Sequence, residues 1–152
     1  MGRVLVAVPW TDVDGEALHE ALGLIRPDHD LVFLTVYQEV PLTLVADGLI
    51  GTPVILPDDA FDDADEEARV SGGRRLRELL DELGLQGVIR VETGDPGERI
   101  RAVAVEVNAD LIVMGSHYSG ALRRLLGGSV ADNVTHHAPC PVLLIRHKDR
   151  AK

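Results

Sequence analysis

The chain has 152 residues, of which 45% are hydrophobic, and a formal net charge of −10 at pH 7. This length suits a single domain with a substantial core, and the acidity argues against nucleic acid as a main partner, because a phosphate backbone attracts a basic surface. Apolar runs fall far below the roughly 20 residues that cross a bilayer, no signal peptide is visible and a single cysteine excludes an internal disulfide, so we expect a cytoplasmic protein without a membrane partner.

The first part of the chain alternates a strand, a helix and a second strand. Residues 3–8 form a continuous apolar run, which predicts a buried strand. Apolar side chains recur at helical spacing over residues 14–25, and Pro27 ends that predicted helix. Residues 30–37 form another largely apolar run, so we expect a second strand there.

A long connection and a long helix occupy the centre of the sequence. Residues 40–57 contain three prolines and two glycines without a clear period, which is typical of a functional loop. The acidic stretch 58–67 suits the first turns of a helix, because negative charge is favourable at that end. We expect Gly72-Gly73 to weaken or bend this helix and Gly84 to cap its C-terminal end.

A strand, a turn and a helix follow this long helix. Residues 88–91 predict a third strand. Gly94-Asp95-Pro96 predicts a turn in which the proline opens a helix, since proline is favoured at the first helical position. That helix is expected over residues 98–107.

The C-terminal part carries a glycine-rich segment between two predicted strands. Residues 111–114 are an apolar run that predicts a strand ending at Gly115. After a loop, Gly128-Ser129 opens a predicted helix that runs to His137. Residues 140–146 predict a last strand, and the prolines at its beginning are tolerated at a sheet edge.

The alternation of strands and helices predicts an α/β fold. We expect a single domain built on a doubly wound, five-stranded parallel sheet with helices on both faces. Ligands of such sheets bind beyond the carboxyl ends of the strands. The loops over residues 9–14, 37–57 and 115–128 all leave the predicted sheet at that edge, so the binding residues should lie there.

The loop and the helix start between Gly115 and Ser129 favour an anion. The first backbone N–H groups of a helix have no partner within it, and together with the helix dipole they attract phosphate. Glycines allow a backbone to approach such a group closely. The strand, the glycine-rich loop and the helix start therefore predict a phosphate cradle.

This segment resembles the nucleotide-binding motif of the universal stress protein (UspA-like) family, Gly-x2-Gly-x9-Gly-[Ser/Thr]. Gly115 matches the first glycine and Gly128-Ser129 the last pair, with no gap in the spacing. Tyr118 stands at the middle glycine, and Gly120 lies two residues further on. The resemblance extends over nearly the whole chain.

The resemblance implies the strand order 3-2-1-4-5 in a domain over residues 1–148, followed by a short tail at 149–152. It also implies that the protein acts in stress-related regulation through a protein partner and not by catalytic turnover of a substrate. Finally, it implies a homodimer that forms through the last strand. The residues expected at that interface are Val142, Leu143, Leu144, Ile145 and Arg146.

The resemblance further implies a pocket for ATP, AMP or another adenine nucleotide, with Mg²⁺ only where it accompanies the nucleotide. Phosphate is expected at the glycines and at the start of the last helix. No catalytic residue is expected. The expected binding residues are Pro9, Trp10, Thr11, Asp12, Val36, Met114, Gly115, His117, Tyr118, Gly120, Arg123, Arg124, Gly128, Ser129 and Val130.

The sequence departs from the family's pattern at the nucleoside end of this pocket. Pro9 stands where ATP-binding members usually have an aspartate, and it offers neither a carboxylate nor an N–H. Asp12 is close enough in sequence to take over that role. Trp10, the only tryptophan, either stacks on a base or plugs the place of the adenine. Val36 matches the position whose backbone meets the adenine, although a core valine would look the same.

The phosphate end also has alternatives. Ser129 with Asp132 three residues later resembles an ordinary capping box, and this aspartate would make the site less attractive to an anion. Arg123 and Arg124 either neutralise phosphate oxygens or form a solvated basic turn.

The histidines and the cysteine predict no metal or nucleophilic site. The six histidines are scattered, and His136 and His137 suit the C-terminal end of a helix, where positive charge is favourable. His117 has no evident carboxylate partner, so we do not expect it to act as a general base. Cys140 lies between two prolines and is interpreted as a small buried hydrophobic residue.

Two function hypotheses remain open. The absence of the motifs Gly-x4-Gly-Lys-[Ser/Thr] and Gly-x-Gly-x2-Gly excludes motors, kinases and dehydrogenases. The first hypothesis is a nucleotide-binding regulatory module whose affinity is reduced. The second is a nucleotide-free dimeric interaction protein in which Trp10 and Tyr118 fill the pocket. A slow ATPase is a third, but no catalytic base or metal carboxylate is visible beyond Asp12.

Overall fold

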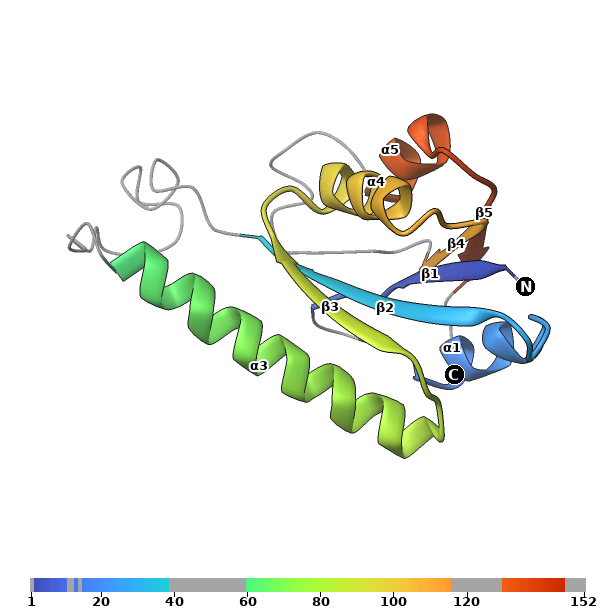
Figure 1. The fold of residues 1–152 in the computed structure, drawn as a ribbon, viewed down its shortest axis with the longest axis horizontal. Helices are drawn as coiled ribbons and strands as arrows, with labels where there is room; N and C mark the ends of the chain where they lie inside the picture. Colours follow the sequence, from blue (N-terminus) through green and yellow to red (C-terminus); the bar gives the residue numbers. More distant parts are fainter. Residues whose placement is uncertain (1, 11–12, 14, 39–59, 116–129, 147–152) are drawn as a thin grey trace, which may run out of the picture.

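The computed structural model describes residues 2–10, 13, 15–38, 60–115 and 130–146, which form strands and helices in alternation (Figure 1). The strands are β1 (Arg3–Ala7), β2 (Asp30–Tyr37), β3 (Val88–Thr93), β4 (Leu111–Gly115) and β5 (Val142–Ile145). The helices among these residues are α1 (Gly15–Gly23), α3 (Ala60–Leu83), α4 (Pro96–Glu106) and α5 (Val130–His137).

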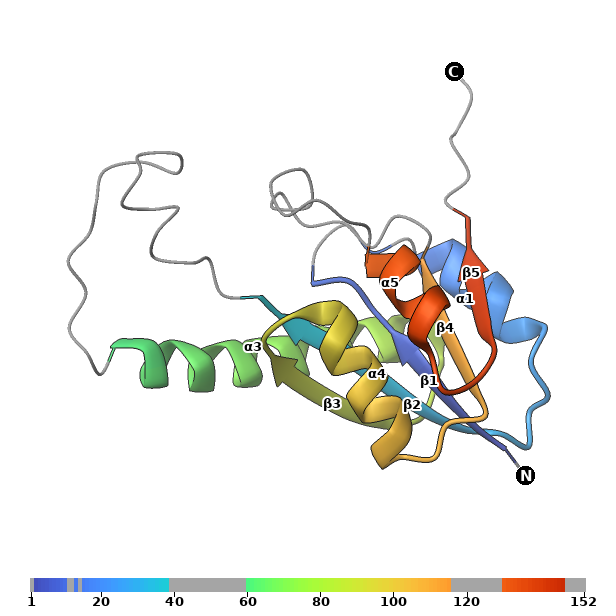
Figure 2. The ribbon, with the colours of Figure 1, turned by 90° about the horizontal axis from the view of Figure 1, so that it is seen from above.

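The strands form one parallel sheet in the order β3-β2-β1-β4-β5, which confirms the predicted fold class and strand order. β1 lies in the centre, where Val4 pairs with Leu31 of β2 and with Leu111 of β4. β3 and β5 are the two edge strands, as the view from above shows (Figure 2). Parallel strands need crossover connections, and the helices between them supply these.

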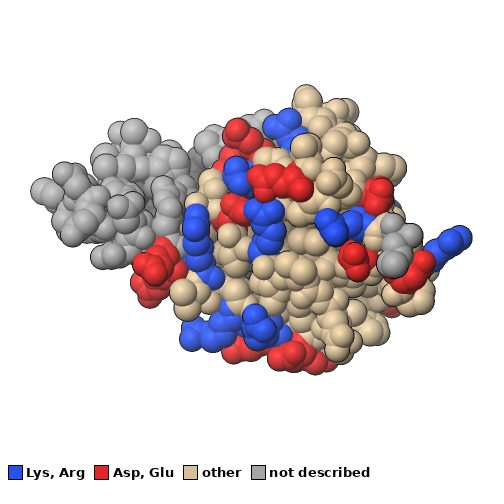
Figure 3. Space-filling model, in the orientation of Figure 1, with Lys and Arg blue, Asp and Glu red and all other residues tan. Residues whose placement is uncertain are grey.

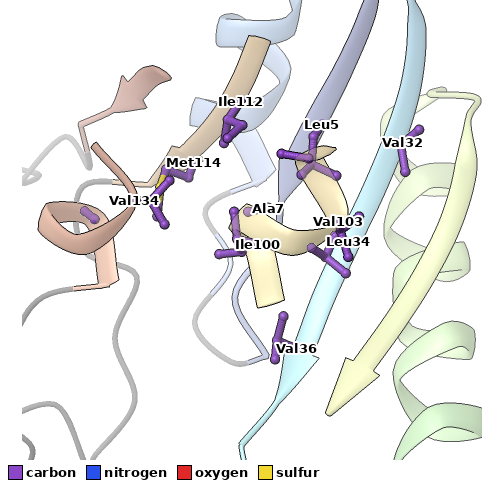
Figure 4. Packing of buried hydrophobic residues seen from close by; sticks show 12 residues of the cluster. Leu5, Ala7, Val32, Leu34, Val36, Ile100, Val103, Ile112, Met114 and Val134 are labelled. Carbon is purple, nitrogen blue, oxygen red and sulfur yellow. The ribbon is translucent and has the colours of Figure 1, made fainter. Parts of the chain in front are cut away.

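The side chains of the strands alternate between two core layers, one on each face of the sheet. Leu5 of β1 packs on one face with Ile100 of α4 and Val134 of α5 (Figure 4). Val4 packs on the other face with Leu76 of α3, and α1 covers the same face (Figure 1). Because helices cover both faces, every position of β1 after Arg3 is buried, which explains its continuous apolar run.

Local signals in the sequence set the helix ends. Asp95 caps α4, because its carboxylate accepts a hydrogen bond of 2.9 Å from the backbone N–H of Glu98. Pro96 takes the first helical position, as predicted. Gly84 follows α3 with a φ of 65°, a left-handed conformation that suits glycine, so the predicted C-terminal cap is confirmed.

Several predicted bounds differ from the structure. β3 extends to Thr93 and β5 is limited to Val142–Ile145. α3 continues through Gly72-Gly73 as one helix of 24 residues, so the two glycines do not interrupt it. Its packing against the sheet outweighs a propensity cost of about 1 kcal/mol for each glycine. The loop predicted over residues 40–57 lies outside the described residues, as does the helix start predicted at Gly128-Ser129.

Charged side chains of both signs lie side by side on the face of the molecule shown in Figure 3. On the edge strand β3, Arg90 pairs with Glu92 at 2.5 Å and with Glu106 of α4 at 2.9 Å, and Arg99 of α4 pairs with Glu92 at 3.0 Å. Partial burial lowers the pKa of Arg90, but its hydrogen bonds with both glutamates outweigh this effect and the pKa is raised. β3 is thus a charged edge, a common protection against pairing with another chain.

Within the part of the chain that the structure describes, no helix combines the length and the apolar character needed to cross a membrane. The longest of them, α3, begins among acidic residues. It covers the sheet with its apolar face, where Leu76 and Leu80 are buried. α3 is therefore a surface helix of the domain.

Candidate functional site

The carboxyl ends of β1, β2 and β4 meet at one edge of the sheet. Ala7, at the end of β1, pairs with Leu34 of β2 and with Met114 of β4. The backbone N–H of Val8 donates to the carbonyl oxygen of Leu34 at 2.8 Å, which extends the contact beyond the strand. Helix α5 connects the parallel strands β4 and β5, so its first residue, Val130, lies towards the same edge.

The structure therefore brings to this edge those predicted binding residues that it describes. They are Pro9, Trp10, Val36, Met114, Gly115 and Val130. The other predicted residues lie outside the described ranges: Thr11, Asp12, His117, Tyr118, Gly120, Arg123, Arg124, Gly128 and Ser129.

At this edge, the strand ends present backbone groups to a ligand, because their side chains are buried in the core. Val36 is 2% exposed and Met114 is fully buried, and both belong to the core under α4 and α5. Among the described residues, no atom approaches within 4 Å of where a side chain of Gly115 would begin. A ligand placed here would meet the backbone groups that follow Val36 and Met114, and Gly115 would not obstruct it.

Trp10 is held between the end of β2 and the long helix α3. Its ring lies 5.1 Å from that of Tyr37, at an interplanar angle of 60°. The guanidinium carbon of Arg75 lies 5.7 Å from the centre of the indole, a cation–π distance. Gly72 lets the helix approach this ring, because a side chain there would begin 2.6 Å from Trp10 Cζ3. Pro9 and Trp10 also line a cavity of about 230 Å³.

Gly72 and Arg75 are neighbours of Trp10 that were not predicted from the sequence. Gly72-Gly73 was interpreted as a weak point in a helix, whereas Gly72 is a point of close approach. A glycine in a helical pattern can also indicate close packing, so the sequence did contain a sign of the contact between Gly72 and Trp10. For Arg75 the sequence contains no such sign, because arginines are common on this helix and only the tertiary fold shows which one contacts the indole.

Substituting each of the two central glycines of α3 tests this contact. We expect Gly73→Ala to raise the free energy of unfolding by up to about 1 kcal/mol, because alanine favours the helix. A methyl group there would begin 3.9 Å from Val91, which is ordinary contact. Gly72→Ala should lack this gain and shift the fluorescence of Trp10, since the methyl group displaces the ring. Equal stability and unchanged fluorescence in both variants would contradict the placement of Trp10.

The remaining candidates behave as buried or solvated residues. Burial raises the pKa of the Cys140 thiol, and the negative charge of Asp110 adds to this shift. The thiol is therefore a poor nucleophile, and Cys140 packs against the core under α4 and α5. His137 lies at the end of α5, with Nδ1 3.0 Å from the carbonyl oxygen of Asn133. Among the described residues, no group of three histidine, cysteine or carboxylate side chains is arranged to hold a metal ion.

Comparisons with known proteins agree with this architecture. The model of the Universal stress protein family matches residues 1–146. The universal stress protein YxiE of Bacillus subtilis is 30% identical over 148 residues, which cover 95% of this chain and 98% of that protein.

Solved structures share the fold along nearly the whole chain. Hypothetical protein MJ0577 aligns with a TM-score of 0.66 and 23% identity, over 97% of each chain. A universal stress protein in complex with cAMP aligns at 0.58 and 24% identity, over 95% of this chain and 96% of that one. A universal stress protein family protein of Arabidopsis thaliana with AMP bound aligns at 0.58 and 20% identity, over 98% of this chain and 94% of that one. At these identities the likeness concerns the fold alone.

Proposed function

This chain belongs to the universal stress protein family, and on that premise we propose that it is a regulatory module of the stress response that binds an adenine nucleotide. The module acts in its nucleotide-bound state and through a protein partner, and its role is not to hydrolyse the nucleotide.

The observation that carries this proposal is the convergence at one sheet edge. The ends of β1, β2 and β4 meet there, and α5 starts towards the same edge. In parallel α/β sheets, this edge is where ligands bind. The fold neighbours in complex with cAMP and with AMP support adenine as the base.

We assign the roles in this site from the sequence motif. The backbone of Val36 meets the adenine, and Gly115 leaves room for the nucleotide between the strand ends. Gly128, Ser129 and Val130 bind the phosphates through backbone N–H groups at a helix start. Arg123 and Arg124 neutralise the phosphate charge, and Mg²⁺ enters only with a nucleotide that carries it.

The affinity for nucleotide is expected to be weak, because Pro9 and Tyr118 replace the residues that the family's motif favours. Calorimetric titration of the purified protein with ATP and with AMP should give a Kd of about 0.1–1 mM, or roughly 4–5.5 kcal/mol of binding. Sub-micromolar binding would show that neither replacement impairs the site. Absence of binding heat at about 10 mM nucleotide would favour the alternative below.

The second candidate function is a nucleotide-free dimeric interaction protein. The contacts of Trp10 with Tyr37, Gly72 and Arg75 favour it, since a ring fixed in place fills space at the sheet edge. In this account, Trp10 and Tyr118 occupy the volume that a nucleotide would take. The titration above separates the two functions, because the filled pocket binds neither ATP nor AMP.

We further propose that the protein is a homodimer that forms through Val142, Leu143, Leu144, Ile145 and Arg146. β5 is an edge strand whose residues are all apolar, and Leu144 is 39% exposed. The other edge strand, β3, carries ion pairs instead. An uncovered apolar edge invites pairing with another chain, so a second copy of β5 is its natural cover.

Light scattering tests the dimer. The unmodified protein should be a dimer at micromolar concentration, and Leu144→Glu should raise the dissociation constant at least about tenfold, since a charge would enter the apolar interface. Val88→Glu is the matched control, because Val88 is 62% exposed and lies on β3, the edge strand on the other side of the sheet from β5. A stable monomer of the unmodified protein, or equal effects of both variants, would refute this interface.

A further inference from the structure

A cavity of about 230 Å³ lies between helix α3 and the carboxyl ends of β1 and β2. Val8 lines it from the β1 side, and Leu76 and Leu79 line it from α3. The indole of Trp10 and the side chain of Val13 extend this apolar lining. Such walls favour an apolar body over a charged or strongly hydrated one.

Thr35 of β2 places a hydroxyl group at this cavity. The residue is 3% exposed, and it is the one buried polar residue in the ranges that the structure describes. Thr35 Oγ1 is not one of the buried side-chain atoms without a partner, since in the described ranges only Arg99 Nε is one. The hydroxyl lies at the cavity, where it can donate a hydrogen bond to a bound molecule or accept one from it.

Arg75 of α3 brings a positive charge to the same cavity. Its guanidinium lies over the indole of Trp10, and the residue as a whole is exposed. No carboxylate of a described residue lies within ion-pair distance of it, although the chain carries a net charge of −10. A guanidinium that pairs with none of the described carboxylates is suited to a carboxylate of a ligand.

We propose that this cavity binds a small aromatic carboxylate with a polar group on its ring. The ring occupies the apolar walls, the carboxylate meets Arg75 at the exposed side, and the polar group meets the buried hydroxyl of Thr35. The size suits one ring with a short chain. A cavity of about 150 Å³ admits benzene, and drug-sized ligands need about 300 Å³ or more.

This cavity is separate from the proposed nucleotide site. Val8, Leu76 and the neighbouring core residues belong to the face of the sheet that α1 and α3 cover. Val36 and Met114 belong to the opposite face, under α4 and α5. Among the described residues, Pro9 and Trp10 border both. The proposed ligand therefore lies on the opposite face of the sheet from Val36 and Met114, and we expect it to bind whether or not a nucleotide is present.

Fluorescence of Trp10, the only tryptophan, reports binding directly. We expect para-hydroxyphenylpropionate to cause a saturable change with a Kd of about 0.1–1 mM. Phenylpropanol, which lacks the carboxylate, should bind about tenfold more weakly. AMP at saturating concentration should leave the affinity for para-hydroxyphenylpropionate unchanged. No saturable change, or displacement by AMP, would overturn the proposal of a separate site.

Variants of Arg75 test the charge. Arg75→Gln should weaken binding of para-hydroxyphenylpropionate about tenfold, and Arg75→Lys should recover part of that loss, because the ammonium keeps the charge but not the planar geometry. Arg77→Gln is the control, since Arg77 is exposed on the same helix and does not line the cavity. If Arg75→Gln and Arg77→Gln weakened binding equally, the cause would be the net charge of the protein. That result would contradict a direct contact between Arg75 and the ligand carboxylate.

Thr35→Val separates a binding role from a structural one. Valine keeps the shape but removes the hydroxyl, so para-hydroxyphenylpropionate should lose its advantage over unsubstituted phenylpropionate. The melting temperature should stay within about 2 °C of that of the parent, because the hydroxyl faces the cavity and its removal leaves no protein group unpaired. A clearly lower melting temperature would show that the hydroxyl serves the fold. This result, or a variant that still binds para-hydroxyphenylpropionate more tightly than phenylpropionate, would overturn the assignment of the hydroxyl to a ligand.

Discussion

Replacing Gly128 by Asp is expected to weaken ATP binding by at least about thirtyfold, to below detection, while leaving the fold intact. In the proposed site, Gly128 lies at the helix start that receives the phosphates. A carboxylate there repels them and competes for the same backbone N–H groups. Calorimetry with ATP measures the loss, and circular dichroism with thermal melting checks the fold.

Gly23→Asp is the matched control for this substitution. Gly23 ends α1, is exposed, and has no atom within 4 Å of where its side chain would begin. Gly23→Asp introduces the same charge as Gly128→Asp, so it reports any general electrostatic effect of that charge on the binding of an anionic ligand. Unchanged ATP affinity in Gly128→Asp, or an equal loss in both variants, would place the phosphates elsewhere.

The combination of Pro9→Asp and Tyr118→Gly is expected to strengthen ATP binding by about 10–100-fold. The aspartate restores a carboxylate at the nucleoside end, and the glycine lets backbone approach the phosphates. The two changes act at different ends of the nucleotide, so each single variant should contribute part of the gain and their free energies should add. Calorimetric titrations of the parent, both single variants and the double variant measure this.

A double variant that binds ATP no more tightly than the parent would contradict the account of the two departures. Pro9 is partly buried beside Trp10, so the thermal stability of each variant must be compared as well. A gain in affinity with unchanged stability would identify the substitutions as local changes to the site.

Much of the fold was predictable because short segments of the sequence carry strong local signals. The apolar run at residues 3–8 indicated a strand buried on both faces, and β1 has that character. Gly84 and the turn at Gly94-Asp95-Pro96 marked helix ends, because their backbone conformations suit those residues. The strand order came from the resemblance to a family, since local signals do not specify which strands are neighbours.

The features that could not be predicted depend on contacts between distant parts of the chain. Gly72 is a contact with Trp10, but the sequence shows only a glycine in a helix. Thr35 is a polar residue in an apolar strand, and only the structure shows that it lines a cavity. The binding roles of Pro9 and the glycine-rich segment stay predictions, because most of that segment lies outside the described residues.

The most direct test of the central claim is an amide NMR spectrum of the protein titrated with ATP. We predict saturable shifts concentrated at the carboxyl edge of the sheet, at the amides next to Val36, Gly115 and Val130, and at the indole N–H of Trp10. Signals of amides at the amino ends of the strands, beside Arg3 and Asp30, should not shift. Shifts confined to the amino ends of the strands, or no shift at about 10 mM ATP, would contradict the account of a nucleotide-binding module.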